Sequence, residues 1–124
     1  MRAHLDAPEV SLSEALRERF FGDWEGSAAD TYARVWAADQ TDSDQVGGGV
    51  EPVAAVLDRT TALIADLERR YSGRHILLVS HGDPLQILQA GFLRLSPTSH
   101  RRLPALRTAE IRPLRLEERA ASPR

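Results

Sequence analysis

The amino-acid sequence predicts an α/β fold in a single domain. A long amphipathic helical pattern is followed directly by a short apolar run, and a second helical pattern is followed by a segment that alternates polar and apolar residues. Helix, strand, helix and strand in this order are typical of helices packed on a sheet. The length of 124 residues suits one domain spanning 1–124, and we expect its ends, 1–11 and 117–124, to be poorly ordered.

The first part of the chain predicts turns before any regular element. Residues 12–16 suit a short helical turn, with Ser11 or Ser13 as its N-cap. The segment Phe20–Gly26 is aromatic and interrupted by glycine, which favours a loop.

One helix and one flexible loop complete the first half. Residues 28–38 predict a helix, because the large side chains Tyr32, Val35 and Trp36 recur on one side of it. The polar segment Thr41–Gly49 ends in three glycines and predicts a flexible surface loop.

The clearest helix of the sequence runs from Pro52 to about Tyr71. Apolar side chains recur there at spacings of three and four, at Val53, Leu57, Thr60, Ile64, Leu67 and Tyr71. Proline suits the first helical position, and Gly73 suits the point where the helix stops.

Two strands and a further helix are predicted after this point. The continuous apolar run Ile76–Ser80 suits a strand buried on both faces, as in a parallel sheet. A helix is expected over Leu85–Leu95, and 96–104 forms a turn region. The alternating segment Thr108–Leu116 suits a strand, and Pro113 places that strand at an edge or near its end.

The junction His81-Gly82-Asp83-Pro84 is the sharpest chemical feature. Asp83 suits a helix N-cap and Pro84 the first helical residue. Ligands bind beyond the carboxyl ends of strands in open α/β sheets, and a helix N-terminus favours an anion such as phosphate. His81 could hydrogen-bond a phosphate oxygen there, or it could simply end the strand and face solvent.

A second candidate is Glu18, which lies between Arg17 and Arg19 and just ahead of an aromatic cluster. Partial shielding by aromatic rings would suit Glu18 to general-acid work, and the arginines could orient an anionic substrate. The other reading of this segment is a solvated run of charges.

Composition narrows the class of protein. The chain has no cysteine, which excludes a disulfide scaffold, a thiolate zinc site and a thiol nucleophile. The four histidines lack metal-ligand spacing, so we expect neither a metal nor a cofactor. No apolar run is long enough to cross a bilayer, which predicts a soluble, cytoplasmic protein without a membrane partner.

Charge is distributed unevenly between the two halves. Residues 1–66 contain 5 arginines and 13 acids, whereas residues 67–124 contain 11 arginines and 5 acids. The basic half could bind an anion, but its arginines are not interleaved with aromatics, so no nucleic-acid partner is predicted. The more ordinary explanation is that the halves pack together or carry solvated faces. Within the basic half, His75 is expected at the surface and His100 in a solvated turn.

Three segments in a fixed order resemble the histidine phosphatase superfamily, the phosphoglycerate mutase-like family of phosphomonoesterases and phosphomutases. They are Leu16–Gly26, the Gly49-Val50-Glu51 helix entry with its helix through Arg59, and Leu78–Gly82. The resemblance extends to 100–116 and covers nearly the whole chain. It implies a three-layer phosphoglycerate mutase-like α/β sandwich, N-terminally truncated.

The resemblance also implies a mechanism. In this family a histidine of an Arg-His-Gly motif attacks phosphorus and becomes phosphohistidine, while a glutamate protonates the leaving group. Glu18 matches the proton donor and His81 matches a second histidine that stabilises the phosphate oxygens. Arg19 and Gly82 fall where the phosphate would be bound. Phosphoryl transfer depends mostly on positioning and electrostatic stabilisation, which these groups can supply.

This sequence departs from the family pattern because it contains no Arg-His-Gly. His4 lacks a preceding apolar strand and is a poor substitute. We therefore expect a partial domain that binds inorganic phosphate or a small phosphorylated metabolite with little or no turnover. The alternative is a non-catalytic phosphate-binding or interaction module. The absent first strand would leave a sheet edge exposed beside Ile76–Ser80, which predicts a homodimer through that edge.

Overall fold

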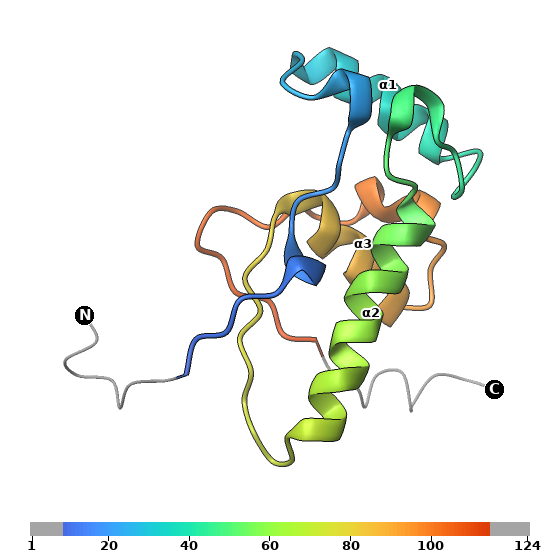
Figure 1. The fold of residues 1–124 in the computed structure, drawn as a ribbon. Helices are drawn as coiled ribbons and strands as arrows, with labels where there is room; N and C mark the ends of the chain where they lie inside the picture. Colours follow the sequence, from blue (N-terminus) through green and yellow to red (C-terminus); the bar gives the residue numbers. More distant parts are fainter. Residues whose placement is uncertain (1–8, 115–124) are drawn as a thin grey trace.

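The computed structural model describes residues 9–114, so residues 1–8 of the predicted lead-in and the predicted tail 117–124 lie outside this part. The described part contains three α-helices, α1 (Ala29–Asp39), α2 (Val53–Arg70) and α3 (Gly82–Phe92). Short 3₁₀ turns accompany them: η2 (Glu14–Leu16) and η3 (Gly22–Trp24) before α1, η4 (Gly47–Gly49) between α1 and α2, and η5 (Pro97–Arg102) after α3. Figure 1 shows α1, η3 and η4 at one end of the molecule. Helix α2 extends from the middle of the molecule to the opposite end.

Helices α2 and α3 pack against each other through a small apolar core. Val53 and Val56 of α2 and Ile87 of α3 are fully buried, and Leu57 packs against them. Val53 and Leu57 belong to the stripe that the sequence predicts, whereas Val56 is not among its predicted positions. Burial of this face gives α2 most of its stability, because propensity alone contributes little to a helix in water.

A second small core holds the α1 end of the molecule together. Phe21, Val35 and Val50 are buried there, and the Tyr32 ring centroid lies 4.6 Å from that of Phe21. The turns η3 and η4 touch through backbone at Gly22, which has φ +60° and no room for a Cβ atom against η4. This contact fixes the turn that follows the Glu18 segment.

The predicted α/β sandwich is wrong for the described residues, because no strand forms between residues 9 and 114. Ile76–Ser80 is extended, but its backbone pairs with no other described segment. Its side chains are not buried on both faces either, since Leu77 and Val79 are 66% and 75% exposed. An apolar run favours extended backbone, but a strand exists only where a partner accepts its hydrogen bonds.

The second predicted strand, Thr108–Leu116, fails for the same reason. Residues 108 and 109 form a turn with Ala109 at φ +65°, and 110–114 is extended without a partner in the described part. Residues 115 and 116 lie outside that part. The two extended segments border an open groove of about 940 Å³, lined on its other side by α2 and α3.

The predicted helices are confirmed with shifted ends. Ser13 caps η2 by accepting the N–H of Ala15 at 3.2 Å, as one of the two predicted caps. Pro52 is the N-cap of α2 instead of its first residue. Helix α3 begins three residues before the predicted start at Leu85, with His81 as its N-cap instead of Asp83.

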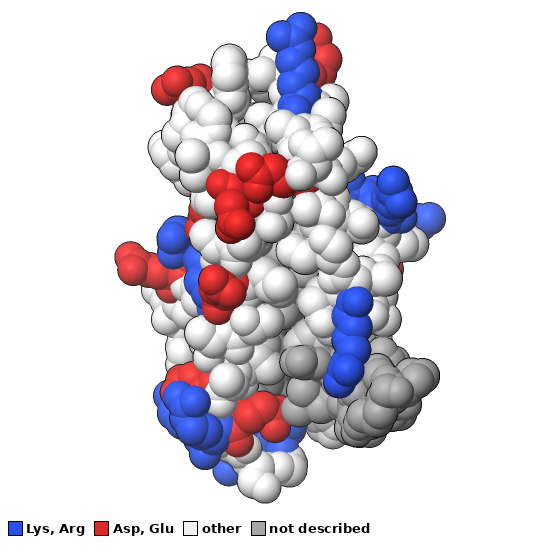
Figure 2. Space-filling model, turned by 90° about the vertical axis from the view of Figure 1, so that its right-hand side faces the viewer, with Lys and Arg blue, Asp and Glu red and all other residues white. Residues whose placement is uncertain are grey.

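The surface mixes charges of both signs. On the face in Figure 2 the arginines are spread from top to bottom among acidic side chains, without one dominant basic patch. None of the helices between residues 9 and 114 combines the length and apolar character that a membrane span requires.

Candidate functional site

His81 stands at the N-terminus of α3, with extended backbone at φ −118° and ψ 167°. Its carbonyl accepts the first helical N–H, that of Leu85, at 3.0 Å. The N–H groups of the first helical turn have no acceptor inside the helix and give this end a partial positive charge. Gly82 is exposed, and a Cβ there would meet nothing within 4 Å. An anion can therefore approach this backbone closely.

Glu18 faces this helix end from the segment after η2. Its Oε2 lies 3.8 Å from His81 Nδ1, and its Oε1 accepts the backbone N–H of Arg19 at 2.9 Å. The two side chains are about half exposed, at 47% for Glu18 and 54% for His81. The separation is too long for a hydrogen bond but short enough for charge interaction. The pair is thus open to a ligand from solvent.

Arg59 of α2 holds the Glu18 segment from behind. Its guanidinium donates to the carbonyl oxygens of Ala15 at 2.6 Å and Glu18 at 3.4 Å. It also donates to the Glu51 carboxylate at 2.8 and 3.0 Å. Burial raises the pKa of Glu51, but the hydrogen bonds from Arg59 and the Phe20 N–H, with the charges of Arg59 and Arg17, together outweigh burial and leave that pKa below its ordinary value.

Arg19, predicted to bind phosphate, lies in the interior. It is 1% exposed, and its guanidinium donates to Asp39 at 2.7 and 2.8 Å, to Asp83 at 3.1 Å and to the Glu51 carbonyl at 2.8 Å. Burial lowers the pKa of Arg19, but its two carboxylate partners more than offset this and raise it. The guanidinium is fully engaged inside the protein and does not open onto the Glu18–His81 pair.

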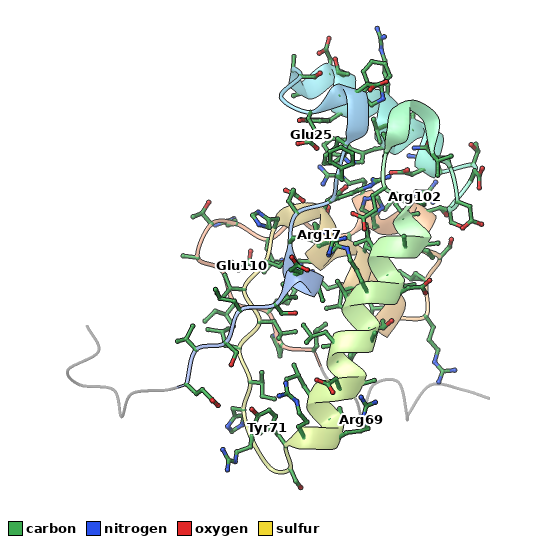
Figure 3. The ribbon with its side chains drawn as sticks, viewed as in Figure 1. Arg17, Glu25, Arg69, Tyr71, Arg102 and Glu110 are labelled. Atoms are coloured by element: carbon green, nitrogen blue, oxygen red, sulfur yellow. The ribbon has the colours of Figure 1, made fainter. Side chains whose placement is uncertain are left out.

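Arg17 is the arginine of this segment that stays at the surface. Its side chain is 54% exposed and reaches Glu51 Oε2 at 3.7 Å. Figure 3 shows Arg17 among the side chains between η2 and α2. The sequence analysis selects Arg19 and not Arg17 for phosphate binding, but the structure leaves Arg17 exposed and buries Arg19.

Sequence reasoning missed the buried partners of the site. Asp83 was expected as a helix cap, yet its carboxylate is buried among Arg19, Trp36, His100 and Arg101. Burial raises the pKa of Asp83, but His100 and Arg19 outweigh this and lower it.

The predicted solvated turn at His100 is wrong, because that ring is 0% exposed. One signal in the sequence could have indicated its burial. Ser96 and Pro97 suit the start of a short helical turn, which would place His100 three residues after Pro97 and within reach of it. In the structure Ser96 caps η5, and His100 Nδ1 lies 2.9 Å from the Pro97 carbonyl oxygen. The exposed position of His75 is confirmed. In the part of the chain with described coordinates, no three acidic or histidine side chains gather as metal ligands would.

The structure thus places a histidine and a glutamate together at the exposed N-terminus of α3. The family model described as "Histidine phosphatase superfamily (branch 1)" matches residues 1–123. The chain belongs to this superfamily.

Two solved structures resemble the chain. "Mycobacterial hydrolase 2" matches with a TM-score of 0.62 and 24% identity, over 76% of this chain and 46% of that chain. "Mycobacterial hydrolase 1" matches with a TM-score of 0.58 and 25% identity, over 76% of this chain and 50% of that chain. The chain therefore spans about half the length of these two structures. A search of curated proteins finds no match.

Proposed function

We propose that the protein takes part in hydrolysis or transfer of the phosphoryl group of a small phosphomonoester, through a phosphohistidine. Family membership and the hydrolase names of two structural relatives support this class of reaction. The observation that carries the proposal is the 3.8 Å separation of His81 Nδ1 and Glu18 Oε2 at the N-terminus of α3. There an imidazole, a carboxyl group and free backbone N–H groups converge on one exposed point.

Each group has a distinct share of the reaction. Glu18, in its protonated form, gives its proton to the leaving oxygen as the P–O bond breaks. His81 and the N–H of Gly82 hydrogen-bond the phosphate oxygens and stabilise their charge. The phosphoryl group passes first to a histidine nitrogen and then to water, which yields inorganic phosphate. The second step frees the histidine nitrogen, and Glu18 takes back a proton from the attacking water.

The 124 residues contain no Arg-His-Gly motif, so they lack the histidine nucleophile in the form that the family uses. The four histidines are His4, His75, His81 and His100. His4 lies outside the described residues, His75 is an exposed residue six positions before His81, and His100 is buried. We propose that these residues alone bind phosphate and turn over little or no ester.

The test is a pair of measurements on the 124-residue chain. Calorimetric titration with inorganic phosphate should show saturable binding that His81→Ala weakens by about tenfold or more, whereas Glu18→Gln, which removes a negative charge and keeps a hydrogen-bonding group, should not weaken it. His75→Ala is the matched control, because His75 is an exposed histidine six residues before the site, and its binding should equal that of the unaltered chain. Phosphate binding that is absent, or unchanged in His81→Ala, would contradict the proposal.

Hydrolysis of p-nitrophenyl phosphate tests whether this chain itself catalyses the reaction. A non-catalytic phosphate-binding module is favoured by the absent motif and by the burial of Arg19, which leaves fewer cations around the phosphate. Binding without turnover in the 124-residue chain agrees both with that module and with the proposed phosphatase, whose Arg-His-Gly nucleophile these residues do not contain. Turnover that both Glu18→Gln and His81→Ala abolish supports catalysis by this chain itself.

We also propose that the unpaired extended segment recruits a second copy of the chain. Leu77 and Val79 present apolar side chains to solvent on a segment whose backbone groups have no partner in the described residues. Such segments invite pairing between chains. Size-exclusion chromatography should show a dimer that Val79→Lys returns to a monomer, whereas a stable monomer of the unaltered chain would contradict the proposal. The cytoplasmic location and the lack of a nucleic-acid partner stay predictions.

A further inference from the structure

The exposed pair of the candidate site cannot hold its own geometry. Glu18 and His81 come from segments 63 residues apart in sequence, and both side chains are about half exposed. Exposed ion pairs contribute little, because solvent screens the charges and ordering the side chains costs entropy. The separation of Glu18 and His81 must therefore be set by their neighbours.

The first connection between the two segments lies on the N-terminal side of the pair. Ser80 Oγ donates to the carbonyl oxygen of Leu16 at 2.7 Å. Ser80 precedes His81 by one residue, and Leu16 precedes Glu18 by two. This is a single neutral hydrogen bond, with a net value of about 1 kcal/mol.

The second connection lies on the C-terminal side and is buried. Arg19, which follows Glu18, donates to Asp83, two residues after His81, at 3.1 Å. The Arg19 side chain is 0% exposed and the Asp83 side chain 4%. Charge-assisted hydrogen bonds away from water are stronger and less screened than exposed ones. This contact is the stronger constraint on the pair.

Asp83 is itself fixed from three further sides. Its Oδ2 accepts the indole N–H of Trp36 at 3.2 Å, and its Oδ1 accepts from His100 Nε2 at 2.8 Å and Arg101 Nη1 at 3.3 Å. Both ring nitrogens of His100 face oxygens that only accept, since Nδ1 lies 2.9 Å from the Pro97 carbonyl. The ring is thus engaged at both nitrogens, and Asp83 is held by groups from α1 and η5 as well as by Arg19.

We propose that Asp83 is a positioning residue of the candidate site, which holds the His81 turn against the Glu18 segment through Arg19. Asp83 touches no substrate in this arrangement. It acts through Arg19 on one side and through the first turn of α3 on the other. The proposal rests on the proposed function for its consequence in phosphate binding, but the geometric claim can be measured separately.

The natural absence of cysteine allows a direct measurement of that geometry. The double variant Glu18→Cys/His81→Cys contains no other thiols, because the natural chain has none. A short bifunctional thiol reagent then cross-links the two cysteines at a rate that depends on their effective concentration. Adding Asp83→Asn should slow intramolecular cross-linking by about tenfold, because the released His81 turn samples more positions.

Two control variants separate positioning from general stability. Asp66→Asn removes a carboxylate whose ion pairs with Arg69 and Arg70 lie at the surface, and it should leave the rate unchanged. Val56→Ala weakens the core between α2 and α3 without touching either connection, and under conditions where it stays folded it should also leave the rate unchanged. An equal loss of rate in Val56→Ala would overturn the proposal.

A second variant tests the same contact if circular dichroism shows that Asp83→Asn does not fold. Arg19→Lys keeps the buried charge but has one ammonium group where the guanidinium reaches Asp39 and Asp83 at once. It should slow cross-linking in the same way. An unchanged rate in a folded Asp83→Asn or Arg19→Lys background would overturn the proposal.

Phosphate binding completes the test in the chain with Glu18 and His81 intact. Asp83→Asn should weaken the binding of inorganic phosphate by about tenfold while Asp66→Asn leaves it unchanged. If the unaltered chain binds no phosphate, the proposed function fails, and the cross-linking rates still decide whether Asp83 positions the pair. If phosphate binds and Asp83→Asn binds it equally well, the positioning proposal fails alone.

Discussion

Replacing Arg19 with methionine removes a buried cation and leaves its carboxylate partners behind. The side chain of Asp39 is 0% exposed and would lose both of its hydrogen bonds to the guanidinium, keeping the amide of Gln45 at 3.1 Å. Removing one partner of a buried ion pair costs about 3–5 kcal/mol, because the other charge stays uncompensated. A small domain has a total stability of about 5–15 kcal/mol, so Arg19→Met should lose a large part of it.

Urea denaturation followed by far-ultraviolet circular dichroism measures this loss. Arg69→Met is the matched control, since Arg69 is 71% exposed in its ion pair with Asp66 and should lose less than about 1 kcal/mol. The double variant Arg19→Met/Asp39→Leu should recover part of the loss, because it removes the stranded charge. A loss in Arg19→Met no greater than that in Arg69→Met would refute the reasoning that these charges lie in a water-excluded cluster.

Three further changes test other parts of the structure. Folding lowers the pKa values of Asp83 and Glu51, so the stability that these carboxylates contribute is fully present above their unfolded pKa values and is lost as the pH falls below about 4. The urea concentration at the unfolding midpoint should therefore fall between pH 7 and pH 3. This fall should be smaller in Asp83→Asn. Gly22→Ala should destabilise by about 1–3 kcal/mol through collision with the η4 backbone, and thermal melting should show a smaller loss for Gly26→Ala, where φ is +76° but space is open. Ile87→Ala should cost about 2–5 kcal/mol in urea denaturation, because its side chain fills the α2–α3 core.

Helices are the part of the fold that the sequence predicts well. Their apolar periodicity is local, so α2 differs from its predicted range of 52–71 by one residue at each end. The start of α3 is displaced for a reason that periodicity cannot show. Asp83 suits a cap by residue type, but its carboxylate is taken by side chains far away in sequence, and the extended backbone of His81 begins the helix instead.

The strands fail because pairing is not a local property. Ile76–Ser80 has the β-branched and apolar residues that favour extended backbone, and its backbone is extended. A partner for its backbone groups has to come from another segment, and residues 9–114 place none there. The pattern therefore gives the residue types that a strand requires but not the partner that would make it one, and the strand predicted there is wrong.

Part of the candidate site could be predicted from the sequence, and part of it depends on contacts that the sequence does not show. The order of three motifs predicts that Glu18 and His81 belong together, and the structure brings them to 3.8 Å. Arg19 and Arg17 flank the same glutamate, so residue type alone cannot say which is buried against Asp39. His100 shows the same difficulty, because a histidine before two arginines suits a solvated turn until its burial is known.

The uneven charge of the two halves takes on a structural meaning at Arg19 and Asp83. Arg19 is one of only 5 arginines in the acidic half, and Asp83 one of only 5 acids in the basic half. The contact that joins the halves at the site is thus made by the scarcer charge of each, buried where salt does not screen it. Charges at the surface are screened by salt, and their attraction extends over only about 10 Å, the Debye length at 0.1 M ionic strength. Specific geometry at the Glu18–His81 pair therefore depends on local contacts, of which the buried Arg19–Asp83 contact is the stronger, and not on the overall attraction of two oppositely charged segments.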